Sequence, residues 1–322
     1  MARPDPLRSG LAEKKGVQVA KVSQVAPGIY QIDTENDPKL SASCVYLVAD
    51  GETTVIDTGP GMVIPQLVSA LRQAGHEAAS LSYIILTHIH LDHAGGVGAL
   101  AQQAPRAKVV AHEQGARHLI DPSRLIAGTR AVFGEDFDKV YGPILPVPQS
   151  QVQAVKGGET LRLGTRELKI VDAPGHAAHH LCIFDTRARG LFCGEALGRR
   201  LPGVDMVTPG AAPPIFDIEQ ALDTVRRLKA LDPALLLYAH HGAARDVDRL
   251  FDLAVKEINA YGEVILKGMK AGEGPAQIQA RLDAYQRANP ESAKLEREYL
   301  DSLNHDMIVP AYMAYFKKKG SA

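Results

Sequence analysis

The sequence predicts an α/β protein with a helical C-terminal extension, and two features of the chain indicate this. Up to residue 243, short apolar or β-branched runs broken by Gly, Pro and Asp-Gly alternate with segments of helical apolar spacing. Beyond that point the chain is charged, keeps helical spacing and shows little strand signal. With 322 residues it can bury a large core, in one domain or two. We divide it into a polar N-terminal arm (1–21), an α/β domain (22–243) and a helical extension (244–322).

The expected elements alternate along the α/β domain. In its first half, strands are predicted over 29–32, 44–49, 53–57, 83–86 and 108–111, and helices over 63–74 and 97–103. In its second half, strands are predicted over 161–163, 168–171, 181–184, 191–193 and 235–238, and a helix over 218–231. Residues 121–150 mix Pro, Gly and aromatic residues, so we expect an irregular or partly helical insertion that forms a lid or a substrate wall. Residues 199–214, rich in Pro and Gly, are expected to be loop.

Charge and cysteine content exclude several classes of partner. The 36 Lys and Arg residues nearly balance 37 Asp and Glu, which argues against nucleic acid or anionic lipid as the main partner. No run approaches the roughly 18 apolar residues of a membrane span, and the N-terminus lacks the apolar region of a secretory signal. Three cysteines without CxxC spacing favour a reducing compartment. We expect a cytoplasmic protein that acts on a small molecule and can form a homodimer.

Histidine is distributed unevenly, since eight of the twelve histidines fall in three short stretches: 88–93, 176–180 and 240–241. The first stretch follows a buried strand and precedes a Gly-Gly pair and a helix. If the strand continues, His88 and His90 point to the same side, and Asp92 and His93 lie on the turn into the helix. Four ligand-type side chains within six residues are more than one metal ion needs, so two adjacent ions are implied.

This stretch resembles the signature of the metallo-β-lactamase-fold superfamily, and further motifs follow in that family's order. They are Val55-Ile56-Asp57-Thr58-Gly59, Ala173-Pro174-Gly175-His176, Phe192-Cys193-Gly194-Glu195 and His240-His241-Gly242. The resemblance covers roughly residues 22–243, the α/β domain. It implies a four-layer αββα sandwich that carries the metals at one edge of its two sheets.

The resemblance also implies a set of metal ligands. They are His88, His90 and His176 for the first metal, Asp92, His93 and His241 for the second, and Glu195 between them. Glu195 stands where the family usually has a bridging Asp, so it could bridge with a shifted geometry, bind one metal only, or leave the second metal weak. His240 is the alternative to His241, which is favoured because the family's ligand usually directly precedes Gly.

Two further residues are expected near the ligands. Asp57 would orient a ligand or its loop, because metal sites commonly depend on such supporting groups. His180 lies four residues after His176, where hydrolytic relatives often have a histidine. It would either support a ligand or face the substrate.

Imidazole and carboxylate donors suit zinc, iron or manganese, and we expect two divalent ions, zinc first. The resemblance then implies a binuclear hydrolase of a small ester, thioester, lactone or phosphoester. It would use a metal-bound hydroxide, with Asp92 as the catalytic residue that orients it. The alternative is a non-hydrolytic diiron protein that binds or reduces oxygen, similar to bacterial oxygen-binding members and favoured by Glu195 and the His-rich run after Gly175. A third hypothesis is a glutathione-thioester hydrolase or a persulfide oxygenase.

Overall fold

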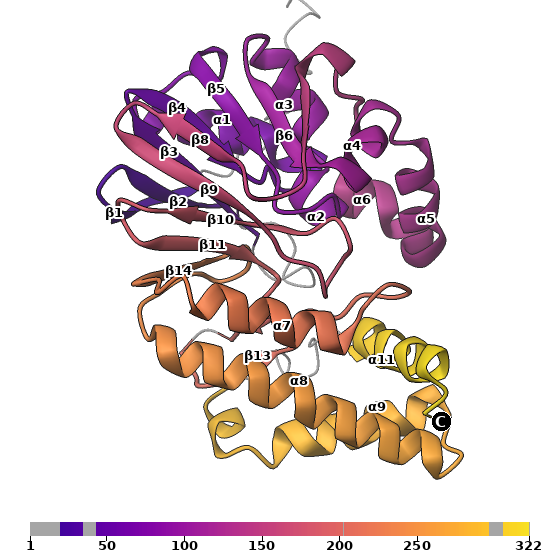
Figure 1. Ribbon diagram of the computed structural model, residues 1–322. Coiled ribbons are helices and arrows are strands. Elements are labelled where there is room, and N and C mark those ends of the chain that lie inside the picture. The colour runs from indigo at the N-terminus through magenta and orange to yellow at the C-terminus, as the bar shows by residue number, and fades with distance from the viewer. Residues whose placement is uncertain (1–19, 35–42, 202, 296–304, 322) are drawn as a thin grey trace, which may run out of the picture.

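Two β-sheets form the centre of the computed structural model, and helices cover the outer face of each sheet (Figure 1). The structure describes residues 20–34, 43–201, 203–295 and 305–321. The predicted arm of residues 1–21 therefore lies outside the described residues except for its last two positions. The layers follow the order helix, sheet, sheet, helix, which confirms the predicted αββα sandwich.

The first sheet has seven strands in the order β1 to β7. They are β1 (Lys21–Ala26), β2 (Ile29–Asp33), β3 (Cys44–Asp50), β4 (Glu52–Ile56), β5 (Leu81–Ile85), β6 (Lys108–His112) and β7 (Val152–Val155). β1 to β4 are antiparallel, whereas β4 to β7 are parallel. The carboxyl ends of the parallel strands therefore meet at one edge of the sheet, where ligand sites of open sheets usually lie.

Helices of the first half cover this sheet and connect its strands. They are η2 (Gly61–Val63), α1 (Ile64–Gln73), η3 (Ala78–Ser80), α2 (Leu91–Ala94), α3 (Val97–Gln103), α4 (Glu113–Ile120), α5 (Ser123–Phe133), η4 (Gly134–Asp136), α6 (Phe137–Tyr141) and η5 (Gln149–Gln151). The insertion expected over 121–150 is therefore largely helical as far as Tyr141. No side chain of α5 is fully buried, but Leu125, Ile126 and Phe133 are partly buried against the small apolar cluster that contains Tyr141.

The second sheet has six strands in the order β15-β14-β11-β10-β9-β8. They are β8 (Thr160–Leu163), β9 (Arg166–Asp172), β10 (Leu181–Asp185), β11 (Gly190–Gly194), β14 (Leu235–Tyr238) and β15 (Gly242–Ala244). Neighbouring strands of this sheet are antiparallel, except for β11 and β14, which are parallel and are connected through α7 (Ile218–Lys229). The connection also contains the short pair β12 (Arg199–Arg200) and β13 (Val207–Thr208), so the stretch predicted as loop is not entirely loop.

The two sheets pack through apolar side chains, with Tyr46 edge-on to Phe192 at a ring-centroid distance of 5.3 Å. A buried ion pair lies at the rim of this layer. Arg166 Nη1 donates to Asp185 Oδ2, and the two side chains are 2% and 0% exposed. Arg166 Nη2 also donates to the Pro27 carbonyl oxygen at 2.8 Å, which ties the second sheet to the turn between β1 and β2.

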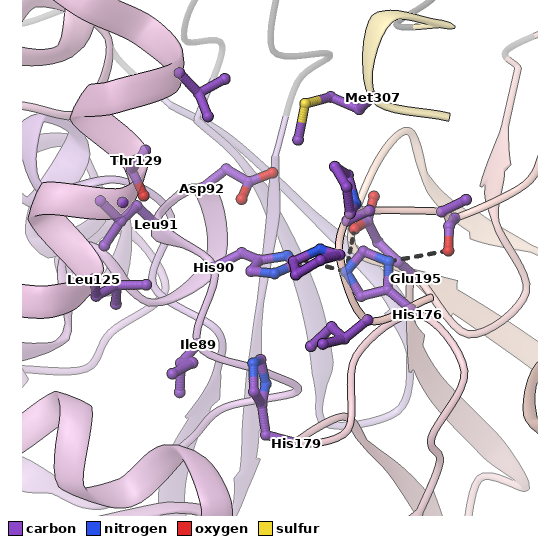
Figure 2. A pocket seen from close by; sticks show the side chains of 18 of the residues that line it. Ile89, His90, Leu91, Asp92, Leu125, Thr129, His176, His179, Glu195 and Met307 are labelled. Atoms are coloured by element: carbon purple, nitrogen blue, oxygen red, sulfur yellow. Dashed lines mark hydrogen bonds and ion pairs between the residues drawn. The ribbon is translucent and has the colours of Figure 1, made fainter. Parts of the chain in front are cut away.

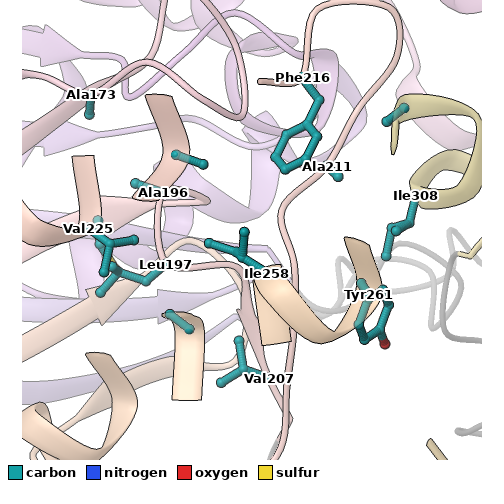
Figure 3. Close-up of a cluster of buried hydrophobic side chains, with 14 of the residues drawn as sticks. Ala173, Ala196, Leu197, Val207, Ala211, Phe216, Val225, Ile258, Tyr261 and Ile308 are labelled. Atoms are coloured by element: carbon teal, nitrogen blue, oxygen red, sulfur yellow. The ribbon is translucent and has the colours of Figure 1, made fainter. Parts of the chain in front are cut away.

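The C-terminal part is helical, as predicted, and consists of α8 (Val247–Lys270), α9 (Pro275–Arg287), η6 (Pro290–Lys294) and α11 (His305–Lys319). One apolar cluster joins these helices to α7 and to the outer face of the second sheet (Figure 3). Within it, Ile258 and Tyr261 of α8 lie with Phe216 and with Ile308 of α11. Among the described helices, none has the length and apolarity needed to cross a membrane.

Candidate metal centre

The first histidine stretch lies at the carboxyl end of β5, at the edge where the parallel strands end. His90 has an extended backbone and immediately precedes α2, so His88 and His90 come before the helix and Asp92 and His93 lie inside it. The turn brings all four side chains to one place. The sequence-based expectation for this stretch is therefore met by the local backbone.

The first donor group consists of His88, His90, His176 and Glu195, whose donor atoms lie within 4.8 Å of one another. The Nε2 atom of His176 lies 3.3 Å from His88 Nε2 and 3.0 Å from His90 Nδ1. It also lies 3.0 Å from Glu195 Oε2. Three segments that are distant in sequence thus place these donors together: the end of β5, the loop after β9 and the end of β11.

The second donor group consists of Asp92, His93 and His240. Asp92 Oδ2 lies 3.3 Å from His93 Nε2 and 3.7 Å from His240 Nε2. The other oxygen of Glu195, Oε1, lies 3.4 Å from His240 Nε2. Glu195 therefore lies between the two groups, with one carboxylate oxygen turned toward each.

The structure places the two adjacent histidines after β14 in different surroundings. His240, rather than His241, lies among the donors. His241 has a left-handed backbone (φ 61°), which turns the chain toward β15, and its side chain lines the adjacent pocket. The donor geometry of this chain therefore favours His240 over the histidine that directly precedes Gly.

Hydrogen bonds among the donor side chains leave some donor atoms unsatisfied, whereas metal ions would bind them. A neutral imidazole carries one N–H for two ring nitrogens, so hydrogen bonds cannot satisfy every nitrogen that converges on His176. His93 Nε2 is also buried without a hydrogen bond. Burial, followed by the neighbouring histidines, holds the pKa of His88 well below its usual range, and burial lowers the pKa of His90 to about 3. These imidazoles stay neutral, which is the form that binds a metal.

The carboxylates of the site are in the ionised, ligand form. Burial opposes ionisation of Glu195, but Arg199 and His176 hold its pKa well below the usual range. In the same way, burial opposes ionisation of Asp92 but His93 lowers its pKa. Burial acts against a charge on His93, but Asp92 and Asp57 raise its pKa well above the usual value. Without a metal the site therefore carries its charge as carboxylate and imidazolium pairs.

Asp57 and His180 both lie behind the donors. Asp57 Oδ1 accepts a hydrogen bond from the Thr87 backbone N–H at 2.8 Å, and its Oδ2 lies 3.4 Å from His93 Nδ1. His180 Nε2 accepts a hydrogen bond from the Glu195 backbone N–H at 3.1 Å. Since His180 is fully buried, the structure has it supporting Glu195 rather than facing a substrate.

Two contacts in this site were not expected from the sequence. Arg199 Nε donates to Glu195 Oε1, and its Nη2 lies 3.9 Å from Asp92 Oδ2, so one guanidinium borders both carboxylates. His176 Nδ1 lies 3.1 Å from the Gly210 carbonyl oxygen, which orients the ring. The spacing of four between Glu195 and Arg199 was the available signal, but it lies in a stretch that looks like loop.

Four of the donors, His90, Asp92, His176 and Glu195, line a pocket of about 910 Å³. The side chains of α5 form one wall and residues 209–215 form the opposite wall. Met307 and Ile308, at the start of α11, complete the lining. Figure 2 shows His90, Asp92, His176 and Glu195 facing this space, with α5 on one side and Met307 on another. A substrate in the pocket can therefore reach both donor groups.

The chain is similar to known proteins. The family model of the metallo-beta-lactamase superfamily matches residues 37–240. The metallo-beta-lactamase fold-containing protein ST1585 of Sulfurisphaera tokodaii is 31% identical over 166 residues, which are 50% of this chain and 61% of that protein. The thioesterase pkgB of Emericella nidulans is 30% identical over 159 residues, 49% of this chain and 36% of that protein.

Solved structures show the same fold. The metallo-beta-lactamase family protein TTHA1429 of Thermus thermophilus has a TM-score of 0.69 at 20% identity, and the match covers 92% of this chain and 95% of that one. At this identity the likeness shows the fold alone. The chain matches less than two thirds of the length of either curated relative, 61% and 36%.

Proposed function

Because this chain belongs to the metallo-beta-lactamase superfamily, we propose that it is a metal-dependent hydrolase of a small ester or thioester. One observation carries the proposal: two donor groups share Glu195 at the floor of a pocket large enough for a small molecule. The similarity to a protein named as a thioesterase supports this choice among the ester-like substrates.

The residues of the site would have different roles in such a reaction. When bound, metals at the two donor groups supply Lewis acidity, which activates water and polarises a carbonyl oxygen. Asp92 stays ionised and lines the pocket, so it can accept a proton from the attacking water. Arg199 is 27% exposed and lines the same pocket, so its guanidinium can donate to an oxygen on which negative charge develops.

The direct test combines metal content with activity. Protein purified without added metal would be analysed for zinc, iron and manganese, then reloaded and assayed on matched thioester, ester, lactone and phosphoester substrates. We expect hydrolysis of the thioester or ester, and its loss in His88→Ala and Glu195→Gln. Arg130→Gln, a change on the outer surface of α5, is the matched control and should keep full activity. Failure of every metal-loaded form on all four substrates would contradict the proposal.

A second candidate is a diiron protein that binds or reduces oxygen, and the observation that favours it is the carboxylate of Glu195 between two imidazole-rich groups. Such oxygen and nitrogen donors suit iron, and all three cysteines are buried outside the two donor groups. Anaerobic purification followed by an absorption spectrum before and after oxygen addition separates the two candidates. Two zinc ions and an unchanged spectrum would exclude the diiron candidate.

A further inference from the structure

We propose that this pocket selects substrates that carry an anionic group, which Arg117 and Arg124 bind at the junction of α4 and α5, away from the metal centre. The inference deepens the proposed function and rests on it for the identity of the reacting bond. It names the substrate class as an ester or thioester with an apolar portion and a negatively charged end.

The cationic group lies on two consecutive helices. Arg117 and His118 belong to the last turn of α4, and Arg124 belongs to the first turn of α5. All three line the same pocket as the metal donors. Arg117 Nε donates to His118 Nε2 at 3.2 Å, so the histidine presents a lone pair to one arginine and stays uncharged there.

No carboxylate within the described residues forms an ion pair with Arg117 or Arg124. Asp121, in the turn between the helices, has its Oδ1 occupied by the backbone N–H and hydroxyl of Ser123, at 3.1 and 2.6 Å. Its single negative charge cannot offset both guanidinium groups. The junction therefore keeps a net positive charge at the pocket.

The position of Arg124 is unfavourable for its own helix. The N-terminal end of a helix carries the positive end of the helix dipole, so a cation in the first turn of α5 does not stabilise that helix. The same helix contains a structural arginine for comparison. Arg130 donates to both carboxylate oxygens of Asp138, at 2.9 and 2.7 Å. The contrast indicates that Arg124 faces something outside the chain.

An apolar surface connects the cationic junction to the metal donors. Leu125, Val132 and Phe133 of α5 line the pocket. Leu125 and Phe133 are also partly buried against the cluster that contains Tyr141, whereas Val132 is 61% exposed. Ile89, between two of the donor histidines, lines the pocket from the other side. In Figure 2, Leu125 and Ile89 lie on the same side of the pocket, with His90 between them and the other donors. Apolar side chains left open in this way are typical of a ligand wall.

One buried polar atom also lacks a partner along this route. His179 Nδ1 has no hydrogen bond and is hidden from solvent, while its ring lies 5.7 Å from the ring of His90. The ring of His179 lines the pocket beside His90. The metal donors match a carbonyl group, the largely apolar wall matches an apolar chain, and the cationic junction matches an anionic end.

The test measures binding and activity separately. n-Octyl sulfonate and n-octanol share an apolar chain and differ in charge, and sulfonate is a weak ligand for metal ions. Their affinity for the metal-loaded protein would be measured by titration calorimetry. We expect the sulfonate to bind roughly tenfold more tightly, as one charge-assisted contact allows in a partly exposed site. The Arg117→Gln/Arg124→Gln double variant should lose this preference, and Arg130→Gln should keep it.

The outcomes separate the anion site from the proposed function. Equal affinity of the wild-type protein for sulfonate and alcohol would overturn the inference, as would a preference that survives in the double variant, since that would assign the anion to Arg199. In the assays, a thioester with a terminal carboxylate should show a higher kcat/KM than its methyl ester, through KM, and only in proteins that keep both arginines. If no substrate is hydrolysed but the sulfonate preference is lost in the double variant, the anion site stands and the hydrolase proposal fails.

Discussion

Replacing Asp185 by Asn tests whether the buried ion pair with Arg166 holds the second sheet in place. Asp185 Oδ1 accepts hydrogen bonds from the backbone N–H groups of Arg187 and Ala188 at 3.0 and 3.2 Å. Asn has the same size and keeps an oxygen that can accept these two bonds. The substitution therefore removes the charge and puts an amide NH2, which cannot accept, in the place of the oxygen that Arg166 Nη1 contacts. It leaves the guanidinium of Arg166, 2% exposed, without its main partner.

The expected cost follows from burial. Breaking a buried ion pair by removing one partner typically destabilises a protein by about 3–5 kcal/mol, because an uncompensated charge stays buried. Here the Pro27 carbonyl remains bonded to Arg166, and Asp50 Oδ2 lies 3.9 Å from its Nε. Both offset part of the loss, so we expect about 3 kcal/mol, the lower end of that range. If the free energy of unfolding falls by about 3 kcal/mol per molar urea, the urea concentration at the unfolding midpoint should fall by about 1 M.

Urea unfolding followed by circular dichroism measures this change. Asp232→Asn is the matched control, because its ion pair with Arg189 is 84% exposed on the aspartate side and should contribute little. Adding Arg166→Met to Asp185→Asn should recover part of the stability, since the stranded charge disappears. A midpoint for Asp185→Asn equal to that of the control, or a double variant less stable than the single one, would refute this account of the pair.

Three further predictions concern the metal centre. His240→Ala should lower the metal content measured by mass spectrometry, and His241→Ala should leave it unchanged. The reverse result would identify His241 as the ligand. Gly210→Ala should weaken metal binding, because the new Cβ would lie 2.4 Å from the Glu195 carbonyl oxygen, whereas Gly128→Ala meets no atom within 4 Å and should bind metal normally. In metal-free protein the urea midpoint should fall as the pH drops from about 7 to about 5. Histidines with a lowered pKa, such as His90, stay neutral in the folded state, whereas the same histidines take up protons in the unfolded chain. A urea midpoint that does not change with pH would contradict this prediction. Such histidines outnumber those with raised pKa, which act in the opposite sense.

The sequence predicts the fold and much of the donor set because both depend on local patterns. Parallel strands buried on both faces appear as short apolar runs, as at Leu81–Ile85, and the residues that follow such runs lie at one edge of a sheet. The stretch from His88 to His93 contains its own turn into α2, so its geometry is encoded within a few residues. The structure accordingly brings His88, His90, His176 and Glu195 together.

The remaining features depend on contacts that span the chain. The choice of His240 follows from the left-handed backbone of His241, which spacing does not reveal. The role of Arg199 follows from the approach of its short strand to Glu195, within a segment whose Pro and Gly content predicts only loop. The sequence understates the helicity of α5 because its apolar side chains are only partly buried and are divided between the pocket and the cluster around Tyr141, which weakens the pattern of a buried helix face.

Helix α11 lies near the end of the chain, so it is synthesised after all the metal donors. The metal donors are complete once His240 has been added, whereas Met307 and Ile308, which close one side of the pocket, follow some 67 residues later. At roughly 5–20 residues per second the ribosome needs several seconds for this stretch. A metal ion that reaches the nascent chain in this interval meets a wider opening than one that reaches the finished protein. The order of residues along the chain thus places every donor of the centre before the residues that close one side of the pocket.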